Sequence, residues 1–230
     1  MSKKETFWIP YADLMTVLMV IFLFISLSYM GLVQFQKNQQ DDIFKEYKQT
    51  KGQIYNELKK TFEKDIKKWD IEIDKDLSIR FVNERILFDF NSARIKPEFQ
   101  QILSEFIPKY LSIILNPKYH DKISEIRIEG HTAAASSYIY SVELSQKRSN
   151  TVLNTFLNHA FYKNLSTSQK DRLQFWLTSN GLAYGRALDN NGDYIFDTNG
   201  VMSIKSRRVE FRIVTTSDKL VEKVLEQLNK

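Results

Sequence analysis

The hydrophobic pattern of the chain begins with an apolar segment, Phe7–Val33. Its last twenty residues, Leu14–Val33, carry no charge, and a helix of that length rises about 30 Å, the thickness of a bilayer's hydrocarbon core. Trp8 and Tyr29 lie near the two ends of the segment, where interfacial aromatic residues are common. The pattern therefore predicts one membrane-spanning helix over residues 9–33.

One acidic residue, Asp13, lies about one turn inside this apolar segment. A carboxylate at that depth costs about 2.5–3.5 kcal/mol of insertion free energy, so it normally faces a protein interior or a water path. Three interpretations are open: a cleaved signal peptide, an inert anchor, or a helix whose Asp13 binds and releases an ion. The length of the apolar run and the absence of an A-x-A cleavage pattern argue against a signal peptide.

From residue 34 to residue 70 the chain is polar, with apolar residues at intervals of mostly three, four or seven. This spacing predicts one helical stripe, and hence a helical stalk that continues the span, with Gly52 as its weakest point. The stripe comprises Ile43, Phe44, Tyr47, Ile54, Leu58, Phe62, Ile66 and Trp69. So narrow a stripe suits either a partner helix or docking on the following domain, and both remain open.

Beyond Trp69 the apolar residues alternate with polar ones, as they do in half-buried strands. We expect strand structure at 71–82, just before an Asn-Ser turn, at 123–130 and at 207–214, and helices from Pro97 to 115, at 141–161, at 166–177 and at 217–230. Pro108 predicts a kink or break in the first of these helices, and Ser166 or Thr167 caps the third. Residues 181–200 read as a polar loop. The order predicts an α+β domain over 71–216, a βαβαβ arrangement with a mixed sheet covered by helices.

Composition limits the chemistry that this domain can perform. The chain has 230 residues, no cysteine and a net charge of +5, so it has neither a disulfide nor a thiolate metal site. Its basic residues are interspersed with acidic ones, which argues against direct nucleic-acid binding. The loop from Asp189 to Asp197 lacks the glycine position and closing glutamate of a calcium loop. No Ser-His-Asp or paired-carboxylate pattern is present, so we expect a binding domain, not an enzyme, without cofactor or metal.

Three segments of the domain resemble the OmpA-like peptidoglycan-binding family: ILFDFNSARIKPE, IRIEGHTAAASSYIYSVELSQKRSNTVLNTFL and SRRVEFRIV. Together they span about residues 85–215, and the spacing from Gly130-His131-Thr132 to Arg148 is that of the family. The resemblance implies a peptidoglycan-binding groove formed by Thr132, Tyr140, Ser141, Leu144 and Arg148. On a helix, the four positions from Tyr140 to Arg148 fall within an arc of about 100°, so they can line one groove.

The chain departs from the family pattern at two of its positions. The family's acid after G-H-T, which helps to hold the diaminopimelate amine of the peptide stem, is Ala133 here, and the family's asparagine after the tyrosine is Ser141. Arg148 stands at the position that meets the stem carboxylate, and a guanidinium can pair with that group through two hydrogen bonds. Loss of the acid predicts weaker binding, a different stem peptide, or an amine held by another group.

The N-terminal segment FWIPYADLMTVLMVIFL resembles the single-span subunits of ion-driven rotary stators, the MotB and ZorB families, and is more similar to the ZorB type of Zorya anti-phage defence. The resemblance implies that Asp13 carries the ion, a proton or sodium. Thr16, one turn away, either assists the ion path or bonds back to the preceding helical turn.

The same resemblance implies partners and a location. Two copies of this chain would lie inside a ring of five multi-span subunits of the MotA/ZorA type, with the domain bound to peptidoglycan. The chain would be a single-pass inner-membrane protein, with residues 1–8 as a short cytoplasmic arm and the domain in the periplasm. A flagellar MotB-type stator and a passive membrane-to-wall tether are the alternatives.

Overall fold

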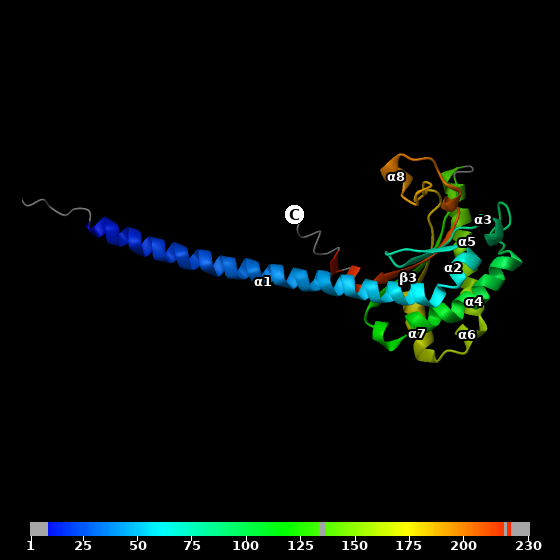
Figure 1. The fold of residues 1–230 in the computed structure, drawn as a ribbon, viewed down its shortest axis with the longest axis horizontal. Coiled ribbons are helices and arrows are strands. Elements are labelled where there is room, and N and C mark those ends of the chain that lie inside the picture. Colours follow the sequence, from blue (N-terminus) through cyan, green and yellow to red (C-terminus); the bar gives the residue numbers. More distant parts are fainter. Residues whose placement is uncertain (1–8, 134–136, 219, 222–230) are drawn as a thin grey trace, which may run out of the picture.

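The computed structural model describes residues 9–133, 137–218 and 220–221. One long helix, α1 (Ile9–Phe62), projects from an α+β domain like a rod (Figure 1). By length and composition, its N-terminal part can cross a membrane. The expected arm at 1–8 and most of the expected C-terminal helix at 217–230 lie outside the described residues.

The helix α1 passes through Gly52, the expected weakest point, without interruption. Thr50 and Ile54, on either side of the glycine, are buried. After a short turn, α2 (Asp65–Trp69) leads directly into the first strand. The apolar N-terminal part and the stalk are therefore one continuous helix.

The domain is built on a five-stranded mixed sheet with the strand order β1-β2-β5-β3-β4. Its strands are β1 (Ile71–Ile73), β2 (Ser78–Phe81), β3 (Ile123–Gly130), β4 (Leu177–Gly181) and β5 (Val209–Thr215). β5 lies between β2 and β3 and is antiparallel to both, whereas β4 runs parallel to β3 at the edge. The predicted α+β class and mixed sheet are confirmed.

The remaining elements are mostly helices. They are α3 (Glu84–Leu87), α4 (Pro97–Ile114), α5 (Tyr138–Asn158), α6 (Ala160–Lys163), α7 (Thr167–Trp176) and α8 (Ile195–Thr198), with 3₁₀ turns at Pro117–Tyr119 and Ile204–Ser206. Ser166 caps α7 through a capping box, as predicted. α4, α6 and α7 lie on one side of the sheet and α8 on the other (Figure 1).

Several local predictions differ from the structure, and one of them is the loop expected at 181–200, which contains the short helix α8. Residues 71–82 form a hairpin of two short strands, because the chain turns at Leu77, which has a φ of 68°. The strand expected before the Asn-Ser turn is instead the short helix α3, capped by the side chain of Asn83, followed by a single bridge between Phe88 and Ile95. β4 was not predicted. Finally, α4 continues through Pro108 without a break.

The C-terminal turns of α1 are part of the domain's core. Ile54, Leu58 and Phe62 are fully buried, and the Phe62 ring stacks on Phe106 of α4 at a centroid distance of 5.2 Å. The structure therefore shows the C-terminal part of the stripe, from Ile54 onward, docked on the chain's own domain. The expected division between a stalk at 34–70 and a domain at 71–216 cuts across this core.

Polar contacts hold the same part of α1 at the edge of the domain. Lys51 Nζ lies 2.8 Å from Asp218 Oδ1, after β5. Glu57 Oε2 accepts hydrogen bonds from Lys118 Nζ at 2.5 Å and from Tyr119 Oη at 2.6 Å. The last turns of α1 are thus held on the domain by buried apolar side chains and, beside them, by the polar contacts of Lys51 and Glu57.

Candidate functional site

A pocket of about 380 Å³ opens at the end of the sheet where β3 stops and α5 begins. All the predicted binding residues line it: Thr132, Tyr140, Ser141, Leu144 and Arg148. Ala133, which replaces the family acid, lines it too. The structure therefore brings these positions together in one site, which leaves their role in ligand binding as a prediction.

Close packing between α5 and the ends of two strands positions this wall of the pocket. A Cβ at Gly130 would lie 2.3 Å from the Ser145 carbonyl oxygen, and a Cβ at Gly181 would lie 2.3 Å from the Gln146 backbone nitrogen. Only glycine permits so close an approach. The Ser137 side chain caps the helix by accepting a hydrogen bond from the Tyr140 backbone N–H. The first two turns of α5 consequently lie beside Thr132.

Arg148 spans the pocket from α5 to the loop after α3. Its Nε donates a hydrogen bond to the Ser92 carbonyl at 2.9 Å, and its guanidinium lies 4.9 Å from the centroid of the Phe88 ring. Burial lowers the pKa of Arg148 from its ordinary value, although an arginine stays cationic near neutral pH. Within the described part of the chain, Nη1 and Nη2 of Arg148 have no hydrogen-bond partner. Those two groups are the donors that a carboxylate would need.

The opposite wall of the pocket contains charged residues that the sequence reasoning did not assign to the site. Asp89 follows α3, and Arg207 and Arg208 precede β5. Glu84 of α3 pairs with Arg207, with 2.5 Å between Oε2 and Nη1. Asp89 belongs to the ILFDFNSA segment, and Arg207 and Arg208 belong to SRRVEFRIV, so the motifs contained these three positions without assigning them a role.

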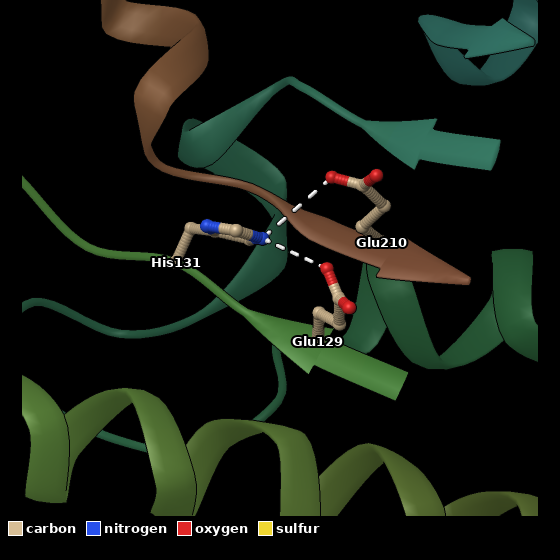
Figure 2. A group of neighbouring side chains, drawn as sticks. All are labelled: Glu129, His131 and Glu210. Atoms are coloured by element: carbon tan, nitrogen blue, oxygen red, sulfur yellow. Dashed lines mark ion pairs between the residues drawn. The ribbon is translucent and has the colours of Figure 1, made fainter. Parts of the chain in front are cut away.

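A buried charge cluster lies directly behind the pocket, between β3 and β5 (Figure 2). His131 Nε2 is 3.7 Å from Glu129 Oε2 and 3.6 Å from Glu210 Oε2. Glu210 also accepts hydrogen bonds from Arg208 Nε at 3.0 Å and from Arg212 Nη2 at 2.9 Å. His131 and Arg208 line the pocket as well, so this cluster supports its floor.

The three groups in Figure 2 are close enough to hold a metal ion, but the surrounding arginines argue against one. Arg208 and Arg80 both direct an Nε at Glu210 Oε2, the oxygen that would serve as ligand. Burial by itself would raise the pKa of Glu210, but Arg208 and the neighbouring cations hold it well below its usual range. Burial lowers the pKa of His131. We therefore assign the cluster a structural role.

The candidate ion-carrying residues are on the other functional part of the molecule. Asp13 and Thr16 lie one turn apart near the start of α1, and both side chains are exposed on the rod. They are separated from the pocket by most of α1, and the structure does not bring them to it (Figure 1). The chain thus contains two distinct candidate sites joined by one helix.

Comparison with known proteins gives matches over the domain and over the whole chain. The model of the OmpA family matches residues 87–184. The Zorya protein ZorB of Escherichia coli strain Crooks is 35% identical over 240 residues, which cover 98% of this chain and 95% of that protein. ZorB of E. coli O139:H28 is 28% identical, over 92% of this chain and 81% of that protein.

Solved structures similar to the domain include two bacterial proteins. The cell wall anchor of the type VI secretion system from Pseudomonas aeruginosa matches with a TM-score of 0.44 and 18% identity, over 69% of this chain and 96% of that chain. The periplasmic domain of Helicobacter pylori MotB matches with a TM-score of 0.40 and 16% identity, over 70% of this chain and 99% of that chain.

Proposed function

Because this chain belongs to the ZorB family, we propose that it is the single-span stator subunit of an ion-driven membrane motor that acts in anti-phage defence. The observation that carries the proposal is the continuous helix α1. It joins an apolar segment that contains one acid, Asp13, to a domain whose pocket contains Arg148. One part would carry ions across the membrane while the other is held still.

In this proposal the pocket grips the peptide stem of peptidoglycan. Arg148 receives a stem carboxylate through Nη1 and Nη2, and the Phe88 ring and the Ser92 carbonyl hold the guanidinium in place for that contact. Thr132, Tyr140, Ser141 and Leu144 form the adjoining wall. Binding of this kind requires no bond making or breaking, in keeping with a subunit that anchors a machine and is not an enzyme.

Ion movement is assigned to Asp13, with Thr16 as an assisting hydroxyl. Two copies of α1 would lie inside a ring of five multi-span subunits, where Asp13 loads and releases a proton or sodium ion. Each charge that crosses the membrane potential releases about 2.3 kcal/mol per 100 mV. The proposed output is rotation of the ring about the two helices, with the arm at 1–8 in the cytoplasm and the domain in the periplasm of a single-pass inner-membrane protein.

The test compares Asp13→Asn with Asp42→Asn, a matched change on an exposed acid of the same helix outside the apolar segment. In cells that carry the whole system, Asp13→Asn should abolish phage resistance while membrane levels of the chain and its assembly with the ring stay normal. Asp42→Asn should retain resistance. Swimming is scored in the same strains.

Each rival function predicts a different result in this experiment. A passive tether from membrane to wall predicts that Asp13→Asn keeps full phage resistance. A flagellar stator predicts that deletion of the gene abolishes swimming and leaves resistance unchanged. Recovery of the full chain in the cytosolic fraction would rule out the membrane assignment altogether.

A further inference from the structure

The pocket contains one carboxylate that is not neutralised by a close partner. Of its two acidic residues, Glu84 is paired with Arg207 at 2.5 Å. The ion contact of Asp89 is to Arg94 Nε, at 4.0 Å, and the Arg94 side chain is 83% exposed. A long contact to so exposed a partner contributes little. The Asp89 carboxylate therefore has no close cationic partner among the described residues.

The Asp89 carboxylate does not take part in the hydrogen bonds that close its turn. Aspartates in turns usually accept hydrogen bonds from nearby backbone N–H groups. In the described part of the chain, the Asp89 side chain accepts none. The turn is closed instead by backbone bonds, from Asp89 N–H to the Arg94 carbonyl and from Ser92 N–H to the Asp89 carbonyl, both at 3.1 Å. The Ser92 hydroxyl accepts from the Arg94 N–H at 3.0 Å.

The same loop fixes Arg148 relative to this free acid. Phe88 and Ser92, which flank Asp89 in the turn, are the two contacts of the Arg148 guanidinium. Arg148 of α5, whose Nη1 and Nη2 donate to no described residue, is thus held against the loop that contains Asp89, and the structure shows no bond between the two side chains. A ligand that has a carboxylate and an ammonium on one carbon atom would satisfy both.

We propose that Asp89 receives the ammonium, and Arg148 the carboxylate, of the free amino-acid end of a diamino acid in the peptide stem. This inference rests on the proposed function, because it takes a cell-wall peptide as the ligand. Of the three effects expected from the loss of the family acid at Ala133, it selects the last: another group holds the amine. That group lies across the pocket, on the loop after α3, and not at the end of β3.

The test measures binding of two fluorescently labelled tripeptides to the full-length chain in detergent. The first is L-alanyl-γ-D-glutamyl-meso-diaminopimelate, and the second replaces its last residue with 2-aminopimelate, which keeps the far carboxylate and lacks the far amine. Asp89→Asn should weaken binding of the first peptide about tenfold to a hundredfold, the range for loss of a hydrogen bond to a charged group. Binding of the second peptide should stay within about twofold of wild type.

Two further variants separate the proposed contact from a general effect on the loop. Asp171→Asn, on an exposed acid of α7 outside the pocket, should leave both affinities unchanged. Arg94→Gln removes the distant partner of Asp89, so the preference for the amine-bearing peptide should persist or increase. Loss of that preference in Arg94→Gln would overturn the assignment.

The results distinguish failure of this inference from failure of the proposed function. If Asp89→Asn weakens both peptides equally, the acid supports the loop and does not bind the amine. If Asp89→Asn weakens neither peptide although Arg148→Ala weakens both, the pocket binds stems without Asp89. A wild-type chain that binds neither peptide contradicts the wall-binding function itself.

Discussion

Replacement of Phe62 by alanine tests whether the stalk and the domain share one core. The Phe62 side chain is fully buried. Its ring centroid lies 5.2 Å from that of Phe106, on which it stacks, and 6.2 Å from that of Trp69. Truncation of a buried phenylalanine to alanine costs about 3–5 kcal/mol, since it removes apolar burial and leaves a cavity. Because domains are stable by only about 5–15 kcal/mol, Phe62→Ala should lower the free energy of unfolding by a large fraction.

The assay is urea unfolding of the full chain in detergent, followed by tryptophan fluorescence. Trp69 and Trp176 are buried in the domain and report its unfolding. The control is Phe35→Ala, the same substitution on the same helix at a side chain that is 61% exposed, and it should shift the unfolding free energy by less than about 0.5 kcal/mol. If Phe62→Ala and Phe35→Ala have equal effects, the last turns of α1 do not belong to the domain's core.

Three other substitutions test the pocket and the cluster behind it. Arg148→Lys should weaken binding of the diaminopimelate tripeptide about tenfold, because lysine lacks the planar pair of donors, and fluorescence anisotropy measures the change. Ala133→Asp should leave the same binding nearly unchanged, because the ligand's amine is held across the pocket by Asp89; calorimetry measures any difference. Glu210→Gln should cost about 3–5 kcal/mol of stability at neutral pH, since it leaves buried arginines unpaired. Urea unfolding at several pH values measures this last effect.

The pH dependence of the Glu210 contribution has a definite sign. Its pKa in the folded chain is lower than the ordinary value of 4.5, so its ionised form stabilises the fold fully above that value. The contribution is lost as the pH falls below about 4.5 toward the lowered pKa. Wild type should therefore lose more stability than Glu210→Gln between about pH 5 and pH 3. If the two chains lose equal stability in acid, the ionised Glu210 does not stabilise the charge cluster. If Arg148→Lys binds the tripeptide as tightly as wild type, Arg148 does not hold the ligand's carboxylate through two donors.

Half of the pocket could be predicted from the sequence and half could not. The positions from Tyr140 to Arg148 share one face because helical spacing alone places them there, and the structure confirms that they line one pocket. The other wall depends on the loop that contains Phe88 and Asp89, whose position is set by a bridge and by contacts with a distant helix. No local periodicity encodes such contacts.

The same distinction explains the successes and errors in the fold. The apolar segment and the alternation at 123–130 are strong local patterns, and both elements form as predicted. β4, with the sequence LTSNG, has no alternation of apolar and polar residues. It forms because β3 pairs with it and because Gly181, without a side chain, lets α5 pack closely against it. The stripe at Ile54 and Leu58 could not reveal its partner, since a second stalk and the domain core would bury the same apolar face.

The unbroken α1 also sets a fixed height for the anchor. The roughly 20 residues between Val33 and Ile54 rise about 30 Å as one uninterrupted helix. This part of the chain contains no loop that could lengthen or shorten it. In the proposed setting, the pocket can reach only those strands of the wall that lie at its own level above the membrane. The chain would then act as a gauge of the local gap between membrane and wall, and a change in that gap would decide whether the anchor engages.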